Sequence, residues 1–321
     1  MIPGAVSIAA RHLPGGVILI LLLLGGCAAP LQSAKLLGAP PAELSRAVEL
    51  EQVPFFPQER YQCGPAALAT VLTWSGVRVD PRDLVPEVYL PQRKGSLQVE
   101  LTAAARHHGR VPYVLDQDIQ SLLSEVQAGH PVVVLLNLGL SWYPVWHYAV
   151  VVGFDLSRDR LVLRSGRQRR ELLSLEVFER TWRRGERWAV VVMPPGELPS
   201  TARELPYLRA VLPFEQAGAW QTAARAYAAA WQRWPDSAGA GMGLGNSEYG
   251  RGDFAAAAAA YRRLLARRPG FAPALNNLAQ TLAESGDLAA AERYAREALA
   301  AGGQNKVYAE TLQAIRSRME R

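Results

Sequence analysis

Cysteine is scarce in this chain, since the 321 residues include only two, Cys27 and Cys63. A fold held together by disulfides needs many more, so the core must form by burial of apolar side chains. Hydrophobic residues make up 49% of the chain and charged residues 20%, a composition typical of folded globular domains. The length is sufficient for two domains of about 150 residues each.

Motifs that bind metals, phosphate groups or nucleic acids are also missing. His107 and His108 are adjacent, so a helix would place them on different faces, and no carboxylate stands at i+4 spacing. The glycine-rich stretch 241–245 has no strand before it, unlike a phosphate-binding loop. The net charge is +6, but basic and acidic residues are interspersed. We therefore expect no metal, no cofactor and no nucleic-acid partner.

A hydrophobic run long enough to span a bilayer is absent. The run Val17–Leu24 is much shorter than the roughly 20 residues that a transmembrane helix needs. It follows the basic Arg11 and ends in small residues, an order typical of an export signal. Leu24-Gly25-Gly26-Cys27 resembles the bacterial lipoprotein signal, which implies cleavage before Cys27 and a lipid on that cysteine. The residue after the cysteine is Ala28 rather than aspartate, and by this resemblance the protein is sorted to the outer membrane, where it faces the periplasm. The alternatives are an ordinary cleaved signal peptide and an uncleaved anchor.

Composition divides the chain into segments. We expect a signal peptide over 1–26, an Ala- and Pro-rich tether over 27–48, a first domain over 49–196 and a second over 205–321. Pro194-Pro195-Gly196 and Pro199 mark the boundary between the two domains.

The first domain has helical patterns before strand patterns, which predicts an α+β fold. Val- and Leu-rich runs bounded by turn residues predict the strands. The expected helices are Cys63–Trp74, Leu97–His107, Ile119–Gln127 and Leu175–Trp182, and the expected strands are Val132–Leu136, Tyr148–Phe154, Arg160–Leu163 and Trp188–Val192.

The second domain repeats itself every 34 residues. Gly218, Gly252 and Gly286 are spaced by this period, and so are the aromatic, alanine and proline positions around them. The pattern resembles tetratricopeptide repeats, over about residues 205–302, with Lys306–Met319 as a capping helix. This resemblance implies an all-α domain that binds a protein partner. Low complexity is the alternative for the alanine-rich stretch 255–260.

Cys63 is a candidate nucleophile because it begins an apolar helix, directly before Gly64-Pro65. Backbone N–H groups at a helix N-terminus stabilise a thiolate, so we expect a lowered thiol pKa there. The same groups can hold an oxyanion. The alternative is a small buried apolar residue with no chemical role.

His147 is the candidate proton carrier because it opens a Val-rich strand directly after the aromatic loop 142–146. We expect His107, His108 and His130 to be solvated or capping residues. Gln58, five residues before the cysteine, can offer a side-chain N–H to an oxyanion.

Gln58, Cys63-Gly64-Pro65 and His147-Tyr-Ala-Val-Val-Val-Gly-Phe-Asp together resemble the C39 family of cysteine peptidases, over residues 50–195. The resemblance implies a papain-like fold, with Cys63 as nucleophile, His147 as general acid and base and Gln58 as oxyanion donor. The family usually has an aspartate at the end of the following strand, where this chain has Ser165. Ser165 can accept the imidazole N–H but supplies no negative charge. Asp155 lies eight residues from His147 along the strand, too far to replace it.

Two other groups of residues allow two interpretations each. The basic stretches 167–170 and 180–187 are either a rim for an acidic substrate or membrane phosphate, or a solvated surface. The tryptophans either line a substrate cleft or pack inside the domain. They are Trp142, Trp146, Trp182 and Trp188.

The sequence thus predicts a lipid-anchored periplasmic cysteine peptidase that acts on a peptide or protein substrate, with a repeat domain that binds a protein. One alternative is a papain-like scaffold with an impaired site, acting in the assembly of protein complexes. Another is an acyltransferase that uses an amine in place of water.

Overall fold

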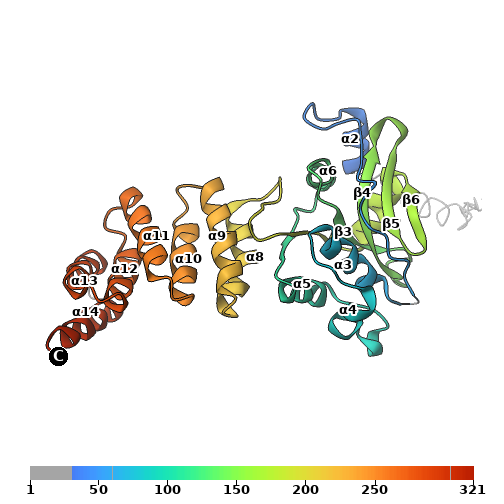
Figure 1. The fold of residues 1–321 in the computed structure, drawn as a ribbon. Helices are drawn as coiled ribbons and strands as arrows, with labels where there is room; N and C mark the ends of the chain where they lie inside the picture. Colours follow the sequence, from blue (N-terminus) through green and yellow to red (C-terminus); the bar gives the residue numbers. More distant parts are fainter. Residues whose placement is uncertain (1–30, 60, 304) are drawn as a thin grey trace, which may run out of the picture.

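The computed structural model describes residues 31–59, 61–303 and 305–321, so the expectations for Cys27 and for the signal peptide lie outside the described residues. A sheet domain and a stack of paired helices follow one another along the chain (Figure 1). None of the helices in the described part combines the length and hydropathy that a membrane span needs.

The first domain is built on a seven-stranded antiparallel sheet. Its order is β2-β7-β3-β4-β5-β6, and β1 pairs with β4 beside β3. The strands are β1 (Ala47–Glu49), β2 (Val111–Val114), β3 (Val132–Asn137), β4 (Trp146–Asp155), β5 (Arg160–Ser165), β6 (Gln168–Leu173) and β7 (Ala189–Met193).

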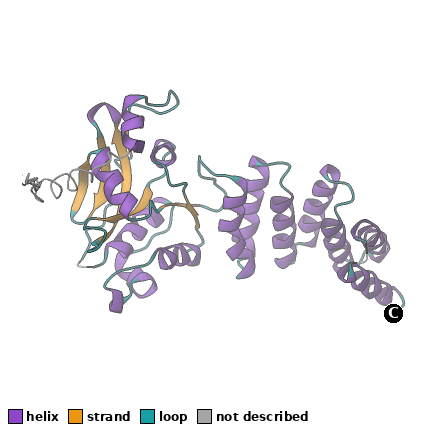
Figure 2. Ribbon diagram, turned by 180° about the vertical axis from the view of Figure 1, so that it is seen from behind, coloured by secondary structure: helices purple, strands orange, loops and turns teal. Residues whose placement is uncertain are grey.

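Helices cover both faces of the sheet (Figure 2). Side chains alternate along a strand, so Val133 and Leu135 of β3 join the core under α3, α4 and α5, whereas Val132 and Val134 join the core under α6 and α7. The helices are α3 (Cys63–Trp74), α4 (Pro81–Val88), α5 (Gln98–His107), α6 (Ile119–Gln127) and α7 (Leu175–Arg184).

The segment expected to be a tether is folded where the structure describes it. Helix α2 (Leu31–Gly38) packs on α7, and the buried carboxylate of Glu179 accepts the Ser33 N–H at 2.8 Å. Leu36 and Leu44 are buried in the core of the first domain. Because β1 also pairs with β4, residues 31–49 belong to this domain and are not a free tether.

The two domains are joined by a tightly held linker. The Glu125 carboxylate is fully buried and accepts N–H groups from Ser200 at 3.1 Å and Thr201 at 2.6 Å, and His130 Nδ1 lies 2.6 Å from it. The Arg203 N–H donates to the Tyr113 hydroxyl at 3.1 Å. The first repeat helix therefore continues the core of the sheet domain.

The second domain consists of antiparallel helix pairs, as the period predicts. Small residues allow close contacts: a Cβ on Gly243 would lie 2.5 Å from the Tyr227 ring, and one on Gly245 would lie 2.3 Å from the Tyr261 ring. The helices are α8 (Glu204–Gln216), α9 (Trp220–Arg233), α10 (Ala238–Gly250), α11 (Phe254–Arg267), α12 (Ala272–Glu284), α13 (Leu288–Gly302) and α14 (Lys306–Met319).

Candidate active site

Helix α3 places Cys63 against β4, close to the backbone of Tyr148. Its residues 64–72 are buried, and Pro65 stands in the first turn, where a missing N–H costs nothing. A Cβ on Gly64 would lie 2.3 Å from Ser96 Oγ, so this first turn packs directly against the loop that precedes α5. The N-terminus of the helix, and Cys63 with it, is thereby held in place.

Adjacent strands bring His147 and Ser165 together. His147 is the second residue of β4, Ser165 is the last residue of β5, and the two strands are paired. The Nε2 atom of His147 lies 2.9 Å from Ser165 Oγ. Ser165 thus contacts the imidazole, in the place that the resemblance to the C39 family implies, and Nδ1 makes no hydrogen bond to the described residues. Asp155 stands at the far end of β4, where its side chain accepts the Arg158 N–H.

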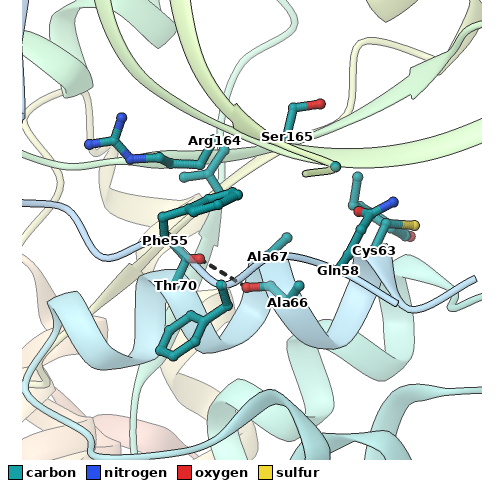
Figure 3. A pocket seen from close by; sticks show the side chains of 12 residues that line it. Phe55, Gln58, Cys63, Ala66, Ala67, Thr70, Arg164 and Ser165 are labelled. Carbon is teal, nitrogen blue, oxygen red and sulfur yellow. Dashed lines mark hydrogen bonds between the residues drawn. The ribbon is translucent and has the colours of Figure 1, made fainter. Parts of the chain in front are cut away.

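Gln58, Cys63 and Ser165 line one small pocket, with Phe55 and Phe56 in its wall (Figure 3). Its volume of about 10 Å³ is close to what a single water molecule requires. The side-chain amide of Gln58 makes no hydrogen bond within the described residues, so its N–H groups are available to a substrate. The pocket as it stands therefore has room for about one water molecule and not for a side chain.

The electrostatics of Cys63 differ from the expectation. The backbone N–H groups of Tyr148, Gly64 and Cys63 itself face the sulfur and favour the thiolate. Burial is the larger effect, however, and raises the pKa of the Cys63 thiol above its usual value. The prediction of a lowered pKa is wrong because the helix start is buried against the sheet. At neutral pH the site holds a thiol.

His147 is also neutral at rest. Burial lowers the pKa of the imidazole below its usual value, and the Glu171 carboxylate counteracts this only in part. No hydrogen bond joins the sulfur of Cys63 to the ring of His147 in the described structure. The pair is therefore a thiol and a neutral base, not a thiolate and an imidazolium.

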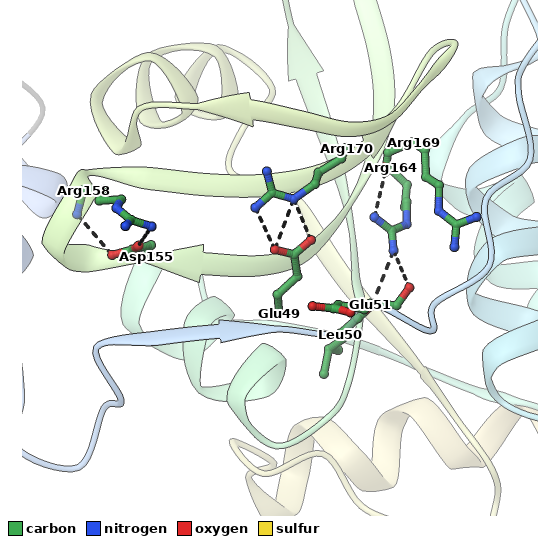
Figure 4. A network of polar contacts seen from close by, with 8 residues as sticks. All are labelled: Glu49, Leu50, Glu51, Asp155, Arg158, Arg164, Arg169 and Arg170. Carbon is green, nitrogen blue, oxygen red and sulfur yellow. Dashed lines mark hydrogen bonds and ion pairs between the residues drawn. The ribbon is translucent and has the colours of Figure 1, made fainter.

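Arg164 positions this site, although its sequence motif does not single it out. It is only 5% exposed, and its guanidinium donates to the carbonyl groups of Glu51 at 3.0 Å and Arg169 at 2.7 Å (Figure 4). It also donates to the carbonyl group of Val53 at 3.2 Å. These bonds hold the segment that leads to Gln58, whose own N–H donates to the Gly166 carbonyl at 3.1 Å. The sequence does carry one signal for Arg164. Side chains alternate along a strand, so Arg164, two residues after Val162, faces the same covered side of β5 as that core residue.

The remaining histidines have partners away from Cys63. His108 Nε2 lies 3.1 Å from Glu87, His130 holds the domain junction, and the ring of His107 packs edge-on against that of His108. Among the described residues, no group of three or more metal-ligating side chains comes together.

The tryptophans divide into two sets. Trp182 is buried and stacks on Phe178, and Trp188 contacts Tyr148 edge-on. By contrast, Trp142 is 80% exposed and Trp146 is 53% exposed. Packing inside the domain therefore accounts for the first set but not for the second.

Several arginines of the basic stretches are paired with carboxylates. Arg170 makes a bidentate contact with Glu49, with N–O distances of 2.8 Å (Figure 4). Arg180 bonds to Glu176 on the same helix. These two pairs favour the interpretation of an ordinary solvated surface for their part of the basic stretches.

Comparison with known families gives two matches. The model of the Peptidase C39 like family matches residues 50–188. The Tetratricopeptide repeat model matches residues 208–270 and 242–306. No curated protein matches the chain.

Solved structures resemble each domain separately. A putative C39-like peptidase from Bacillus anthracis is 20% identical, with a TM-score of 0.40, and the match covers 46% of this chain and 98% of that one. The peptidase domain of Streptococcus ComA, a bi-functional ABC transporter, is 21% identical, with a TM-score of 0.38 and coverage of 44% and 99%. The Yersinia enterocolitica type III secretion chaperone SycD, in complex with a peptide of the translocator YopD, is 18% identical, with a TM-score of 0.33 and coverage of 35% and 92%.

Proposed function

Because residues 50–188 form a C39-like peptidase domain that is followed by tetratricopeptide repeats, we propose that this protein is a cysteine peptidase that hydrolyses peptide bonds through an acyl-enzyme. The observation that carries the proposal is an arrangement of four residues. Cys63, at a helix N-terminus, and the free Gln58 amide line one pocket, and His147 contacts Ser165, which lines the same pocket.

The reaction starts from two neutral groups. His147 Nδ1 takes the proton of the Cys63 thiol while the sulfur attacks the peptide carbonyl carbon. The Gln58 side-chain N–H and the Cys63 backbone N–H stabilise the oxyanion. The C–N bond then breaks, and His147 gives its proton to the leaving amine. Water attacks the carbonyl carbon of the thioester while His147 takes a proton from it. The C–S bond then breaks, His147 returns this proton to the sulfur, and the thiol and the carboxylic acid product are released.

Ser165 has a positioning role in this scheme. Its hydroxyl oxygen accepts the Nε2–H and so keeps Nδ1 unprotonated and directed toward the site. It brings no charge to stabilise the imidazolium that forms during the reaction. We therefore expect slower turnover than an aspartate at this position would allow.

The segment around Cys27 and the repeat domain have roles outside catalysis: the first anchors the protein and the second binds a protein. We infer a lipid on Cys27, which would anchor the protein in the outer membrane facing the periplasm; the sequence Leu24-Gly25-Gly26-Cys27 supports this. The repeats bind a protein partner or hold the substrate, because repeat stacks of this kind offer extended binding surfaces.

The second candidate is a scaffold without activity. It is favoured by the raised pKa of Cys63 and by the missing charge at Ser165. In this case the first domain and the repeats would act together in the assembly of a protein complex.

The test uses a chain that begins at Ala28, in which Cys63 is the sole thiol. It is incubated with a peptide library, and the products are identified by mass spectrometry. Cleavage should be abolished in Cys63→Ala and reduced by about a thousandfold or more in His147→Ala. His107→Ala, which changes a histidine remote from the pocket, is the matched control and should cleave normally. If the unmodified chain cleaves no more than Cys63→Ala does, the scaffold is the better description.

A further inference from the structure

The loop that joins β3 to β4, together with Trp146 at the start of β4, covers residues 138–146 and exposes a cluster of large apolar side chains. It contains no charged residue. Patches of this kind mark an interaction site. The large apolar side chains exposed on this aromatic loop are Leu138, Leu140, Trp142, Tyr143, Val145 and Trp146.

Much of the backbone of the aromatic loop is hydrogen-bonded within the loop and its base. The buried side chain of Asn137 accepts the N–H groups of Gly139 at 3.0 Å and Val145 at 2.9 Å. Leu140 and Tyr143 exchange two further bonds, of 3.1 and 3.2 Å. The lipid part of a bilayer offers few hydrogen-bond partners for backbone N–H and C=O groups. A loop whose backbone groups are hydrogen-bonded to one another can therefore enter the interfacial region at a lower free-energy cost.

The shape and composition of the loop favour a membrane over a peptide as the occupant. Peptide and ligand subsites are concave, whereas Trp142 protrudes with 80% of its surface exposed. Trp and Tyr are the residues that concentrate at the membrane interface. At the base of the loop, Arg184 donates to the Asn137 carbonyl at 2.9 Å. The neighbouring Arg183 is exposed and carries a positive charge of the kind that lipid phosphates attract.

The start of the described chain lies near the same end of the domain. The Ser33 N–H bonds to Glu179 of α7, and Arg184 of the same helix holds the loop base. Five residues of helix separate these two attachment points, about 7.5 Å along the axis. Cys27 is six residues before Ser33, a reach of at most about 20 Å. A lipid on Cys27 and the aromatic loop can therefore meet one bilayer surface.

We propose that the aromatic loop is a membrane-contacting element that enters the interface of a bilayer with anionic headgroups. The proposal rests on the membrane location inferred above. His147 follows the loop directly, so contact with the bilayer turns the candidate active site toward the membrane surface. The substrates would then be segments of proteins that lie close to the bilayer.

The experiment measures binding of the chain that begins at Ala28 to vesicles, both phosphatidylethanolamine–phosphatidylglycerol and phosphatidylcholine, by sedimentation and tryptophan emission. This chain keeps every residue that the structure describes and carries no lipid. The double variant Trp142→Ser/Trp146→Ser should lose affinity about tenfold or more. Arg183→Gln should weaken binding to the anionic vesicles only. The matched control Leu205→Ser/Val307→Ser removes two exposed apolar side chains from the repeats and should bind normally.

The proposal is overturned if the parent chain binds neither vesicle, or if the double variant binds as the parent does. A loop that acts as a peptide subsite would instead show lower peptide affinity in the double variant, without vesicle binding by the parent. The readout needs neither peptide cleavage nor a lipid on Cys27. Failure of the proposed function and failure of this inference are therefore separate results.

Discussion

Single residues decide the protonation state of the candidate site. Cys63 stands at a helix N-terminus that favours a thiolate, yet burial against the sheet has the larger effect and raises its pKa. The pKa of His147 is lowered by the same cause. Because the folded chain then binds fewer protons than the unfolded chain, His147 makes folding less favourable as the pH falls below about 6.5. Activity should accordingly require the neutral imidazole and be lost in acid.

Replacing Ser165 by aspartate tests this account. A carboxylate beside Nε2 favours the imidazolium, so Ser165→Asp should raise the pKa of His147 by about one unit or more. The pKa is measured by NMR titration of the histidine ring. Ser165→Asn, which is similar in size but uncharged, should leave it nearly unchanged. An equal shift in both variants would mean that the change acts through packing and not through charge.

At the scale of elements, local patterns predict the helices well and the edges of the sheet poorly. Helix α3 runs from Cys63 to Trp74 and α14 from Lys306 to Met319, as the spacing of apolar residues predicts. No apolar pattern predicts β6, because its side chains are mostly polar and exposed. None predicts α4 either, because its start is set by the capping box of Asp80 and Asp83 rather than by a long apolar pattern.

Helix α10 packs so closely on its neighbours that replacing one of its glycines by alanine should destabilise the protein, although alanine favours helix formation. Alanine stabilises an isolated helix relative to glycine, but a Cβ at Gly245 would lie 2.3 Å from the Tyr261 ring. Gly245→Ala should therefore destabilise the repeats by about 1–3 kcal/mol, measured by urea denaturation. In the same helix, a Cβ at Gly239 meets only the end of the flexible Leu208 side chain. Gly239→Ala should thus be less destabilising, and equal losses would contradict the packing argument.

For the whole molecule, the two domains share a continuous core. The Tyr113 ring of β2 lies 6.4 Å from the Tyr207 ring of α8, and the linker is bonded to buried Glu125. Burial acts to raise the pKa of Glu125, but hydrogen bonds from His130 and Thr201 outweigh it, so the pKa lies below its usual value. Glu125 therefore stabilises the junction above about pH 4.3, and this contribution is lost as the pH falls through the lowered pKa.

Glu125→Gln should loosen the junction. An amide offers one acceptor oxygen where the carboxylate accepts from Ser200, Thr201 and His130, so we expect a loss of about 2–4 kcal/mol. Limited proteolysis should cut the linker 194–203 faster, and calorimetry should resolve two transitions. Glu197→Gln, an exposed residue of the same linker, is the control. A single unchanged transition in Glu125→Gln would contradict the role of Glu125.

The order of the two domains and the 34-residue register can be read from local spacing, which each segment carries within itself. The candidate site residues Gln58, Cys63, His147 and Ser165 needed the resemblance to the C39 family as well, because no local pattern links them. The raised pKa of Cys63, the burial of Arg164 and the exposure of the aromatic loop could not be predicted without the folded chain. The tertiary structure also decided that residues 31–49 dock on the first domain. All four features depend on which residues are buried. Burial is set by contacts with residues that are distant in the sequence, so it leaves no pattern in the local sequence.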